Sequence, residues 1–286
     1  MIQLVMLIHS AISAGTYIAA KRALDELPPF EVALFRFCVA GLVFGALLLH
    51  RRARIAPRDL VGLTALGALA VPLNQGFFLA GLARSTPGHA ALLYALTPIF
   101  VFLLARLRLG EQATPRKLLG IALAFAGVVV VLGARGLVAL GGSPDQLVGD
   151  LMILLAVVAW ALFAVGGKVY AQRYGPVVST SAAIVIGTLI YLPVGLWRSD
   201  LHRFAALSGT AWTSLGYLVA MTSVVAYLLY YWALSRADAS RVAIWSNLQP
   251  VLTALLAWAV YGERLTGPFV AGGALVLAGV ILTERG

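Results

Sequence analysis

The sequence contains an internal duplication of two apolar segments together with the turn between them. Residues 90 to 133, AALLYALTPIFVFLLARLRLGEQATPRKLLGIALAFAGVVVVLG, recur as residues 242 to 283, VAIWSNLQPVLTALLAWAVYGERLTGPFVAGGALVLAGVILT. The aligned pairs share a constant offset of 152 residues: Leu96 and Leu248, Pro98 and Pro250, Gly110 and Gly262, Glu111 and Glu263, Gly127 and Gly279. A duplication at fixed spacing indicates that the chain consists of two homologous halves.

The composition places these segments in a membrane. With 61% hydrophobic and 11% charged residues, the 286-residue chain has too few polar side chains to cover a soluble protein. A membrane helix needs about 20 apolar residues, and continuous runs of this length favour helices over the short alternating strands of a barrel. The sequence predicts ten such helices, at about residues 2–20, 30–49, 60–81, 89–106, 117–134, 150–168, 177–197, 211–233, 241–260 and 266–283.

The predicted helices divide into two repeats of five. Residues 1–135 form the first repeat, the glycine-rich residues 136–149 form a linker, and residues 150–286 form the second repeat. Because five is odd, the second repeat must enter the bilayer inverted relative to the first, an arrangement common in secondary transporters. The predicted fold class is therefore an all-α polytopic membrane protein built from two inverted five-helix repeats.

The basic residues predict how this bundle is oriented. If the N-terminus is cytoplasmic, the loops on its side carry thirteen Lys and Arg and the opposite loops carry seven. Basic residues are enriched in cytoplasmic loops, so we expect both termini on the cytoplasmic side. The net charge of +10 then follows from contact with an anionic leaflet, and no nucleic-acid partner is expected.

Both repeats resemble the EamA-like domain of the drug/metabolite transporter superfamily. The resemblance lies in a helix with a central proline, a Gly-Glu turn and a glycine-rich last helix. Here these are Pro98, Gly110-Glu111 and Gly120/Gly127, and again Pro250, Gly262-Glu263 and Gly272/Gly279. Lys21, Pro28-Pro29 and Arg36 are similar to the family's opening pattern, whereas Ala14-Gly15 departs from its frequent Trp-Gly.

Within that superfamily the chain looks most like ten-helix bacterial exporters of amino acids and related metabolites, including the YddG-type amino-acid exporters. The resemblance implies an inner-membrane protein in which the first four helices of each half surround a central cavity. The fifth and tenth helices would pack outside it, and their Gly and Ala residues suit close helix contact.

Polar and aromatic side chains near mid-membrane are the candidates for substrate contact. Buried Asn and Gln often bridge helices, and aromatic side chains near helix ends often anchor at the interface, so each candidate also has a structural explanation. Pro98 and Pro250 are predicted to bend their helices. The predicted substrate-binding residues are Tyr17, Asn74, Gln75, Phe78, Tyr94, Thr97, Trp160, Phe163, Tyr227, Trp245 and Gln249.

The charged residues predict an electrically neutral cavity. All eleven acidic residues fall in predicted loops or at helix ends, so no proton relay is evident, and His9 is the only titratable group expected near mid-membrane. Arg36 is expected to extend to the outer interface or to pair with Glu31. Neutral amide and aromatic groups favour export of neutral or aromatic amino acids by alternating access, as uncoupled facilitated diffusion. The alternative is a proton-coupled drug/metabolite exporter.

Other classes of function fit the sequence less well. A membrane enzyme would need a nucleophile with a base or a metal cluster, and no G-x-S-x-G, HExxH or paired intramembrane Asp is present. No cofactor or metal is expected. A passive channel stays open as an alternative, although two prolines at equivalent places favour a moving carrier. We expect a small-molecule substrate, contact with the lipid bilayer, and a monomer or weak homodimer.

Overall fold

The computed structural model describes residues 1–138, 143–261 and 267–286, and every regular element in these ranges is a helix. The first part of the chain forms α1 (Ile2–Leu24), α2 (Pro29–Arg51), α3 (Pro57–Ala68), η1 (Leu69–Gln75), α4 (Gly76–Arg84), α5 (Pro87–Tyr94), α6 (Thr97–Leu109) and α7 (Pro115–Val138). The second part forms α8 (Pro144–Tyr174), α9 (Pro176–Arg198), η3 (Leu201–Ala206), α10 (Gly209–Tyr217), η4 (Leu218–Ala226), α11 (Tyr227–Leu234), α12 (Ala239–Ala243), η5 (Ile244–Asn247), α13 (Leu248–Tyr261) and α14 (Gly267–Glu284).

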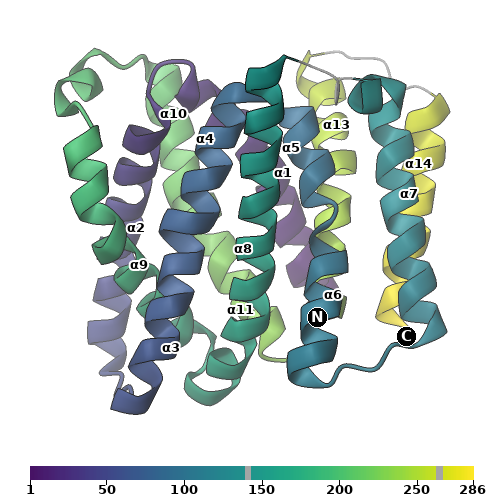
Figure 1. Cartoon of the computed structure of the whole chain (residues 1–286), viewed down its shortest axis with the longest axis horizontal. Coiled ribbons are helices and arrows are strands. Elements are labelled where there is room, and N and C mark those ends of the chain that lie inside the picture. The colour runs from purple at the N-terminus through teal and green to yellow at the C-terminus, as the bar shows by residue number, and fades with distance from the viewer. Residues whose placement is uncertain (139–142, 262–266) are drawn as a thin grey trace.

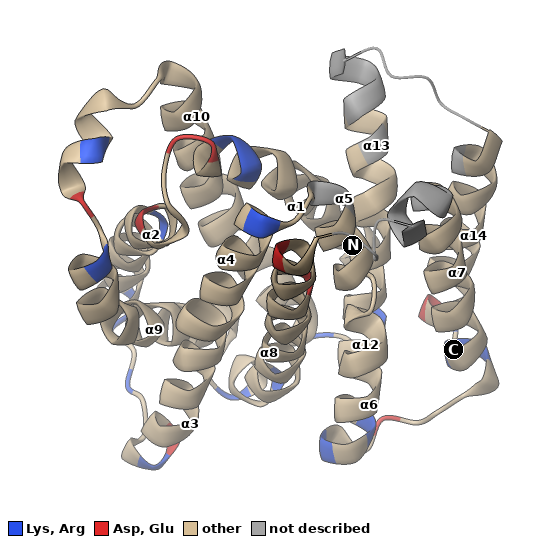
Figure 2. Ribbon diagram, turned by 45° about the horizontal axis from the view of Figure 1, so that its top comes forward, with Lys and Arg blue, Asp and Glu red and all other residues tan. Residues whose placement is uncertain are grey.

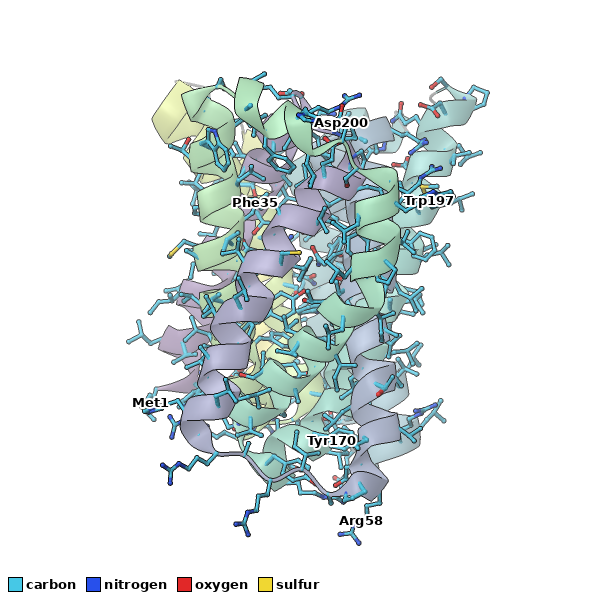
Figure 3. The ribbon with its side chains drawn as sticks, turned by 90° about the vertical axis from the view of Figure 1, so that its left-hand side faces the viewer. Met1, Phe35, Arg58, Tyr170, Trp197 and Asp200 are labelled. Carbon is cyan, nitrogen blue, oxygen red and sulfur yellow. The ribbon has the colours of Figure 1, made fainter. Side chains whose placement is uncertain are left out.

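These helices stand side by side in one bundle, with α8 near its centre and both chain termini toward the same end (Figure 1). Among the described residues, seven helical stretches are long and apolar enough to cross a membrane. Charged residues lie mostly toward the two ends of the bundle (Figure 2), with Arg58 at one end and Asp200 at the other (Figure 3). Apolar flanks between charged ends are what a polytopic membrane protein requires.

Proline and glycine set the ends of these helices. Six helices, α2, α3, α5, α7, α8 and α9, begin with proline, whose missing N–H costs nothing in the first turn. Gly110 and Gly175 adopt φ values of 69° and 80° at the ends of α6 and α8. The turn residues 27–29, 85–88, 110–111 and 174–176 fall between the predicted helices and coincide with observed breaks, whereas Gly262-Glu263 lies outside the described residues.

The connection between α7 and α8 is shorter than the predicted linker of residues 136–149. α7 continues to Val138, and α8 begins at Pro144, where the Ser143 side chain accepts a hydrogen bond from the Gln146 backbone N–H. Residues 139–142 of the linker lie outside the described part of the chain. The proline and its serine cap explain why the helix starts before residue 150.

α7 and α14 pack along each other at the edge of the bundle (Figure 1). Glycines permit this contact: a Cβ at Gly127 would lie 2.6 Å from the Gly272 carbonyl oxygen, and one at Gly279 would lie 2.5 Å from that of Gly120. Close approach of small residues is how membrane helices associate, since burial of apolar surface gives no driving force within lipid. The predicted outer position of the fifth helix thus agrees with the structure.

The Gly110-Glu111 turn connects two distant parts of the chain. Beyond the left-handed Gly110, the Glu111 carboxylate accepts hydrogen bonds from the backbone N–H groups of Ala239 and Ser240, at 2.6 and 3.3 Å. A negative charge there complements the exposed N–H groups at the start of α12. The turn therefore fixes the end of α6 against α12.

Several of the predicted continuous helices are interrupted. Wide π-turns separate α3 from α4 (η1) and α10 from α11 (η4). The fourth predicted helix breaks into α5 and α6 just before Pro98, and the ninth passes through the 3-10 turn η5 before Pro250 in α13. Pro72 lies within η1, where its missing N–H removes one hydrogen bond of the regular helix. These interruptions all lie beside the centre of the bundle.

Candidate functional site

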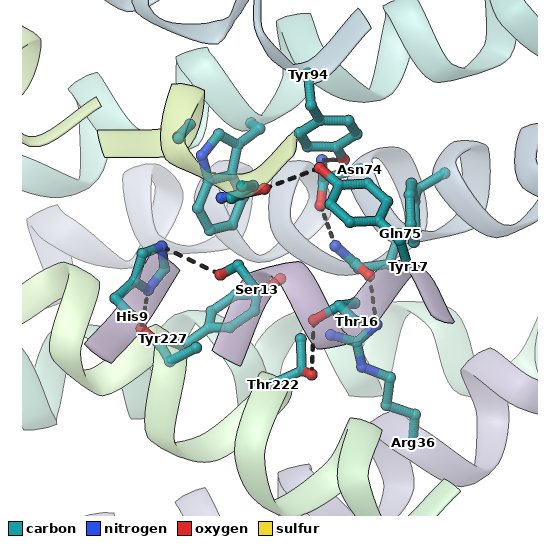
Figure 4. Close-up of a pocket in the computed structure, with 15 residues that line it drawn as sticks. His9, Ser13, Thr16, Tyr17, Arg36, Asn74, Gln75, Tyr94, Thr222 and Tyr227 are labelled. Carbon is teal, nitrogen blue, oxygen red and sulfur yellow. Dashed lines mark hydrogen bonds between the residues drawn. The ribbon is translucent and has the colours of Figure 1, made fainter. Parts of the chain in front are cut away.

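A cavity lies at the centre of the bundle, between helices from both halves of the chain. Its volume is about 70 Å³, and a water molecule occupies roughly 10–15 Å³ of such a space, so the cavity has room for several waters or a small solute. Helices α1, α2, η1, α4 and α5 of the first part of the chain line it, together with α8, η4, α11, η5 and α13 of the second part (Figure 4). The lining residues are His9, Ser13, Thr16, Tyr17, Arg36, Asn74, Gln75, Phe78, Tyr94, Trp160, Thr222, Ala226, Tyr227, Ser246 and Gln249.

The two π-turns bring polar side chains into this cavity. η1 ends with Asn74 and Gln75 and η4 contains Thr222, and these three line the cavity, while Ser223 in η4 accepts a hydrogen bond from Arg36. A π-turn accommodates one more residue than an α-turn and is frequent at functional sites because it changes which side chains face inward. All four of these residues are buried, as polar groups within a membrane bundle must be.

A chain of hydrogen bonds runs along one wall of the cavity. Asn74 Nδ2 donates to the Ala156 carbonyl oxygen at 2.7 Å and to Tyr94 Oη at 3.0 Å. Asn74 Oδ1 accepts from Gln75 Nε2, and Gln75 Oε1 accepts from Arg36 Nη1 at 2.6 Å (Figure 4). The chain therefore joins α8, α5, η1 and α2 and fixes the orientation of both amides.

Arg36 is completely buried, with 0% of its surface exposed, and its guanidinium faces the cavity. Its Nε donates to Ser223 Oγ at 2.5 Å, and its Nη2 makes no hydrogen bond. The prediction that Arg36 extends to the interface or pairs with Glu31 is wrong, because Glu31 Oε1 accepts from the Asp200 backbone N–H at 2.9 Å instead. The prediction of a cavity without fixed charge is also wrong, because the Arg36 guanidinium faces the cavity. α2 is apolar on most faces, so its sequence does not reveal which face points inward.

Hydrogen bonds also cross the cavity between the two halves of the chain. Tyr17 Oη on α1 donates to Gln249 Oε1 on α13 at 2.9 Å. Thr16 Oγ1 on α1 lies 2.9 Å from Thr222 Oγ1 in η4 (Figure 4). α1 is therefore tied to two helices of the second half at the level of the cavity.

Aromatic rings form the remaining walls. Trp160 meets Tyr227 edge to face, with 5.4 Å between ring centroids. Tyr17, Phe78 and Tyr94 form a second cluster, with centroid distances of 5.5 to 6.2 Å. These distances are typical of aromatic pairs and leave apolar ring faces available to a ligand.

Eight of the eleven residues predicted from the sequence line this cavity: Tyr17, Asn74, Gln75, Phe78, Tyr94, Trp160, Tyr227 and Gln249. The other three lie outside the lining. Thr97 is buried in the first turn of α6, and Phe163 lies behind Trp160 with 5.5 Å between ring centroids. Trp245 Nε1 donates to Glu284 Oε1 at 2.9 Å, so this indole is held by α14.

Seven lining residues lie outside the predicted substrate-binding set, although the sequence already placed His9 and Ser13 among the polar side chains near mid-membrane. The seven are His9, Ser13, Thr16, Arg36, Thr222, Ala226 and Ser246. A signal existed for two of them, because His9, Ser13 and Tyr17 are spaced four residues apart and share one helix face. His9 Nδ1 lies 3.1 Å from the Ala226 carbonyl oxygen in η4. Thr222 and Ser246 carried no such signal, since single hydroxyl residues are common in membrane helices.

A second buried polar cluster lies away from the cavity, where α4, α5 and α8 meet. Asp150 Oδ1 accepts from Ser85 Oγ at 2.5 Å, and Asp150 Oδ2 lies 3.0 Å from His89 Nδ1. Because α8 begins at Pro144, Asp150 lies inside the helix and is buried, which corrects the prediction that every acidic residue falls in a loop or at a helix end. Within the described ranges, no three His, Cys, Asp or Glu side chains gather as a metal site would require.

A bundle of membrane-spanning helices around a central polar cavity defines the class of helical membrane transporters. The EamA-like transporter family model matches residues 1–133 and again 147–285. An Archaeoglobus fulgidus transporter of uncharacterized function is 31% identical over 98% of this chain and 96% of its own. The chain belongs to the EamA-like transporter family, and like its relatives it is a transporter and not an enzyme.

Two further relatives and one solved structure extend this comparison. The Escherichia coli inner membrane transporter YedA is 26% identical over 94% of this chain and 86% of its own length. A probable terminal-alkyne amino-acid exporter of Streptantibioticus cattleyicolor is 29% identical over 95% of this chain and 89% of its own. One crystal structure of 22% identity superposes with a TM-score of 0.78 over 99% of this chain and 97% of that chain, which shows a shared fold.

Proposed function

We propose that this transporter exports neutral or aromatic amino acids through the central cavity by alternating access, as uncoupled facilitated diffusion. The observation that carries the proposal is the cavity lining, where amide, hydroxyl and aromatic side chains converge from both halves of the chain. Such groups bind a small solute that has both a polar end and an apolar side chain. The similarity to a probable amino-acid exporter favours the same class of substrate.

The proposed architecture is ten membrane helices in two inverted five-helix repeats, residues 1–135 and 150–286, with both termini cytoplasmic in a bacterial inner membrane. The two separate family matches support this division. So does the pair Lys21 and Lys168, which lie in the last two turns of the first helix of each half. Lys21 Nζ donates to the Ser85 carbonyl oxygen at 3.5 Å, and Lys168 Nζ donates to that of Ala237. We further propose that the protein works as a monomer or weak homodimer.

Alternating access requires that contacts across the cavity break and re-form. The breaks before Pro98 and Pro250 are the proposed bending points, since the helices already lose regular hydrogen bonds there. The hydrogen bonds from α1 to η4 and α13 are the contacts that separate when the halves rock.

The test is release of radiolabelled amino acids from proteoliposomes without a pH gradient. We expect saturable release of phenylalanine and other neutral amino acids, and loss of this release in Trp160→Ala and Asn74→Ala. Trp197→Ala is the matched control, because Trp197 is 81% exposed on the outside of α9 (Figure 3). Unsaturable release that persists in both cavity variants would contradict the proposal.

A second candidate function is proton-coupled export of drugs or metabolites. The buried cluster of Asp150, His89 and Ser85 favours it, because a carboxylate and an imidazole within a membrane protein are the groups that relay protons. In that case release would need, or respond to, an imposed proton gradient.

A further inference from the structure

We propose that the Arg36 guanidinium binds a carboxylate of the transported solute, which makes an organic carboxylate with an apolar tail the substrate class. This inference deepens the proposed function and rests on the central cavity being the transport site. It assigns to Arg36 a role in substrate recognition in place of a purely structural one.

The first argument is the charge of Arg36. Its hydrogen-bond partners, Ser223 and Gln75, are both neutral, and its side chain is 0% exposed. Its guanidinium carbon lies 5.1 Å from the centre of the Phe37 ring, which adds only a weak attraction. Because a buried charge is costly unless it is paired, a guanidinium in this position favours an anion beside it.

The second argument is that no acid of the described chain pairs with Arg36. No Asp or Glu lines the cavity, and no ion pair to Arg36 is present among the described residues. Glu31 pairs with Arg203, Asp59 with Arg173, and Glu111 with Lys117. The described residues therefore supply no anion for the guanidinium, and we infer that a ligand supplies it.

The third argument is geometry. Nε and Nη1 are held by Ser223 and Gln75, while Nη2 is buried and makes no hydrogen bond, and the Arg36 side chain is part of the cavity lining (Figure 4). The Gln75 amide is itself fixed through Asn74, so the guanidinium is oriented before any ligand enters. An arginine with a free N–H edge is suited to the planar oxygens of a carboxylate.

The fourth argument concerns the rest of the ligand. Beyond Arg36, the cavity presents aromatic rings, among them Trp160, Tyr227 and Phe78, which suit an apolar or aromatic tail. Among the described residues that line the cavity, none carries a carboxylate that could pair with an ammonium group. We therefore expect the carboxylate of a solute to be needed for binding, and its amino group to contribute little to the affinity.

The test uses counterflow of labelled phenylalanine into proteoliposomes with three unlabelled competitors. Phenylalanine and 3-phenylpropionate, which lacks the amino group, should both compete. Phenylalaninamide, which lacks the carboxylate, should compete about tenfold less well or worse, because a hydrogen bond to a charged group is lost. The same compounds are added to the purified protein in thermal-shift measurements, which detect binding without transport.

Arg36→Gln should abolish the discrimination between the carboxylates and phenylalaninamide. Arg36→Lys should weaken binding of the carboxylates, but they should still bind better than phenylalaninamide. Arg58→Gln is the control and should behave as wild type, because Arg58 is exposed at one end of the bundle (Figure 3). If Arg36→Gln does not fold, the wild-type and Arg36→Lys results decide the question.

Equal binding of phenylalanine and phenylalaninamide by the wild type would overturn the inference. Thermal stabilisation by chloride equal to that by the carboxylates would overturn it as well. Transport of amino acids with unchanged discrimination in Arg36→Gln would overturn it while keeping the proposed function. Conversely, thermal stabilisation by 3-phenylpropionate that depends on Arg36, with no amino-acid transport, would keep the inference and reject the proposed substrate.

Discussion

Tyr17 on α1 donates a hydrogen bond to Gln249 on α13, with 2.9 Å between Oη and Oε1, across the central cavity. The two residues lie in different halves of the chain, and both are buried. This bond stabilises the conformation in which α1 and α13 are together. Any movement that separates the halves at the cavity must break it.

We predict that Tyr17→Phe shifts the protein away from this conformation. The change leaves a buried amide oxygen without a partner, at a cost of about 1–3 kcal/mol. The apparent affinity for substrate should change together with the maximal rate, measured by counterflow in proteoliposomes. Tyr217→Phe removes a similar bond, from Tyr217 Oη to the Ile12 carbonyl oxygen at 2.7 Å, outside the cavity. If both variants alter transport equally, the cavity bond has no special role.

The contact between α7 and α14 gives a prediction about stability alone. In Gly279→Ala the new Cβ would lie 2.5 Å from backbone atoms of Ala124 and Gly120, so the helices must move apart. We expect a loss of about 1–3 kcal/mol, measured as a lower midpoint of thermal unfolding in detergent. Gly273→Ala on the same helix is the control, because its Cβ would lie 3.7 Å from Val251 Cγ1, an ordinary contact. Equal destabilisation by both changes would contradict the close-packing explanation.

The sequence predicted the helical membrane fold because length, hydropathy and turn residues determine where helices begin and end. It also predicted most of the cavity wall, since Asn74, Gln75 and Trp160 are polar or aromatic where lipid would not accept them. It failed at Arg36, because an apolar helix does not reveal its inward face. The π-turn that places Gln75 beside Arg36 could not be predicted either, since Pro72 is its only signal in the sequence.

The ionic contact between α7 and the start of α12 gives a prediction about pH. Asp238 is partly buried, which alone would raise its carboxyl pKa, but the hydrogen bond and charge of Lys117, 2.9 Å away, lower the pKa below its usual value of 3.8. A carboxyl whose folded pKa is depressed stabilises the protein above its unfolded pKa, and this stability is lost as pH falls toward the folded value.

The midpoint of thermal unfolding should therefore decrease as the pH falls below about 4, and it should decrease less steeply in Asp238→Asn. The effect is small, because the Asp238 side chain is 43% exposed and solvent screens the pair. Thermal unfolding in detergent across this pH range is the measurement. An identical pH profile for wild type and Asp238→Asn would show that the pair contributes nothing to stability.

The last prediction separates uncoupled transport from proton-coupled transport. If release is uncoupled, substrate flux should carry no protons, and Asp150→Asn should lower stability without changing the response to a pH gradient. The loss of stability follows because Ser85 and His89 would lose a charged partner, at a cost of about 1.5–3 kcal/mol for a hydrogen bond to a charged group. A pH-sensitive dye inside the proteoliposomes reports proton movement directly. Acidification that accompanies substrate flux and disappears in Asp150→Asn would instead establish proton coupling through this cluster.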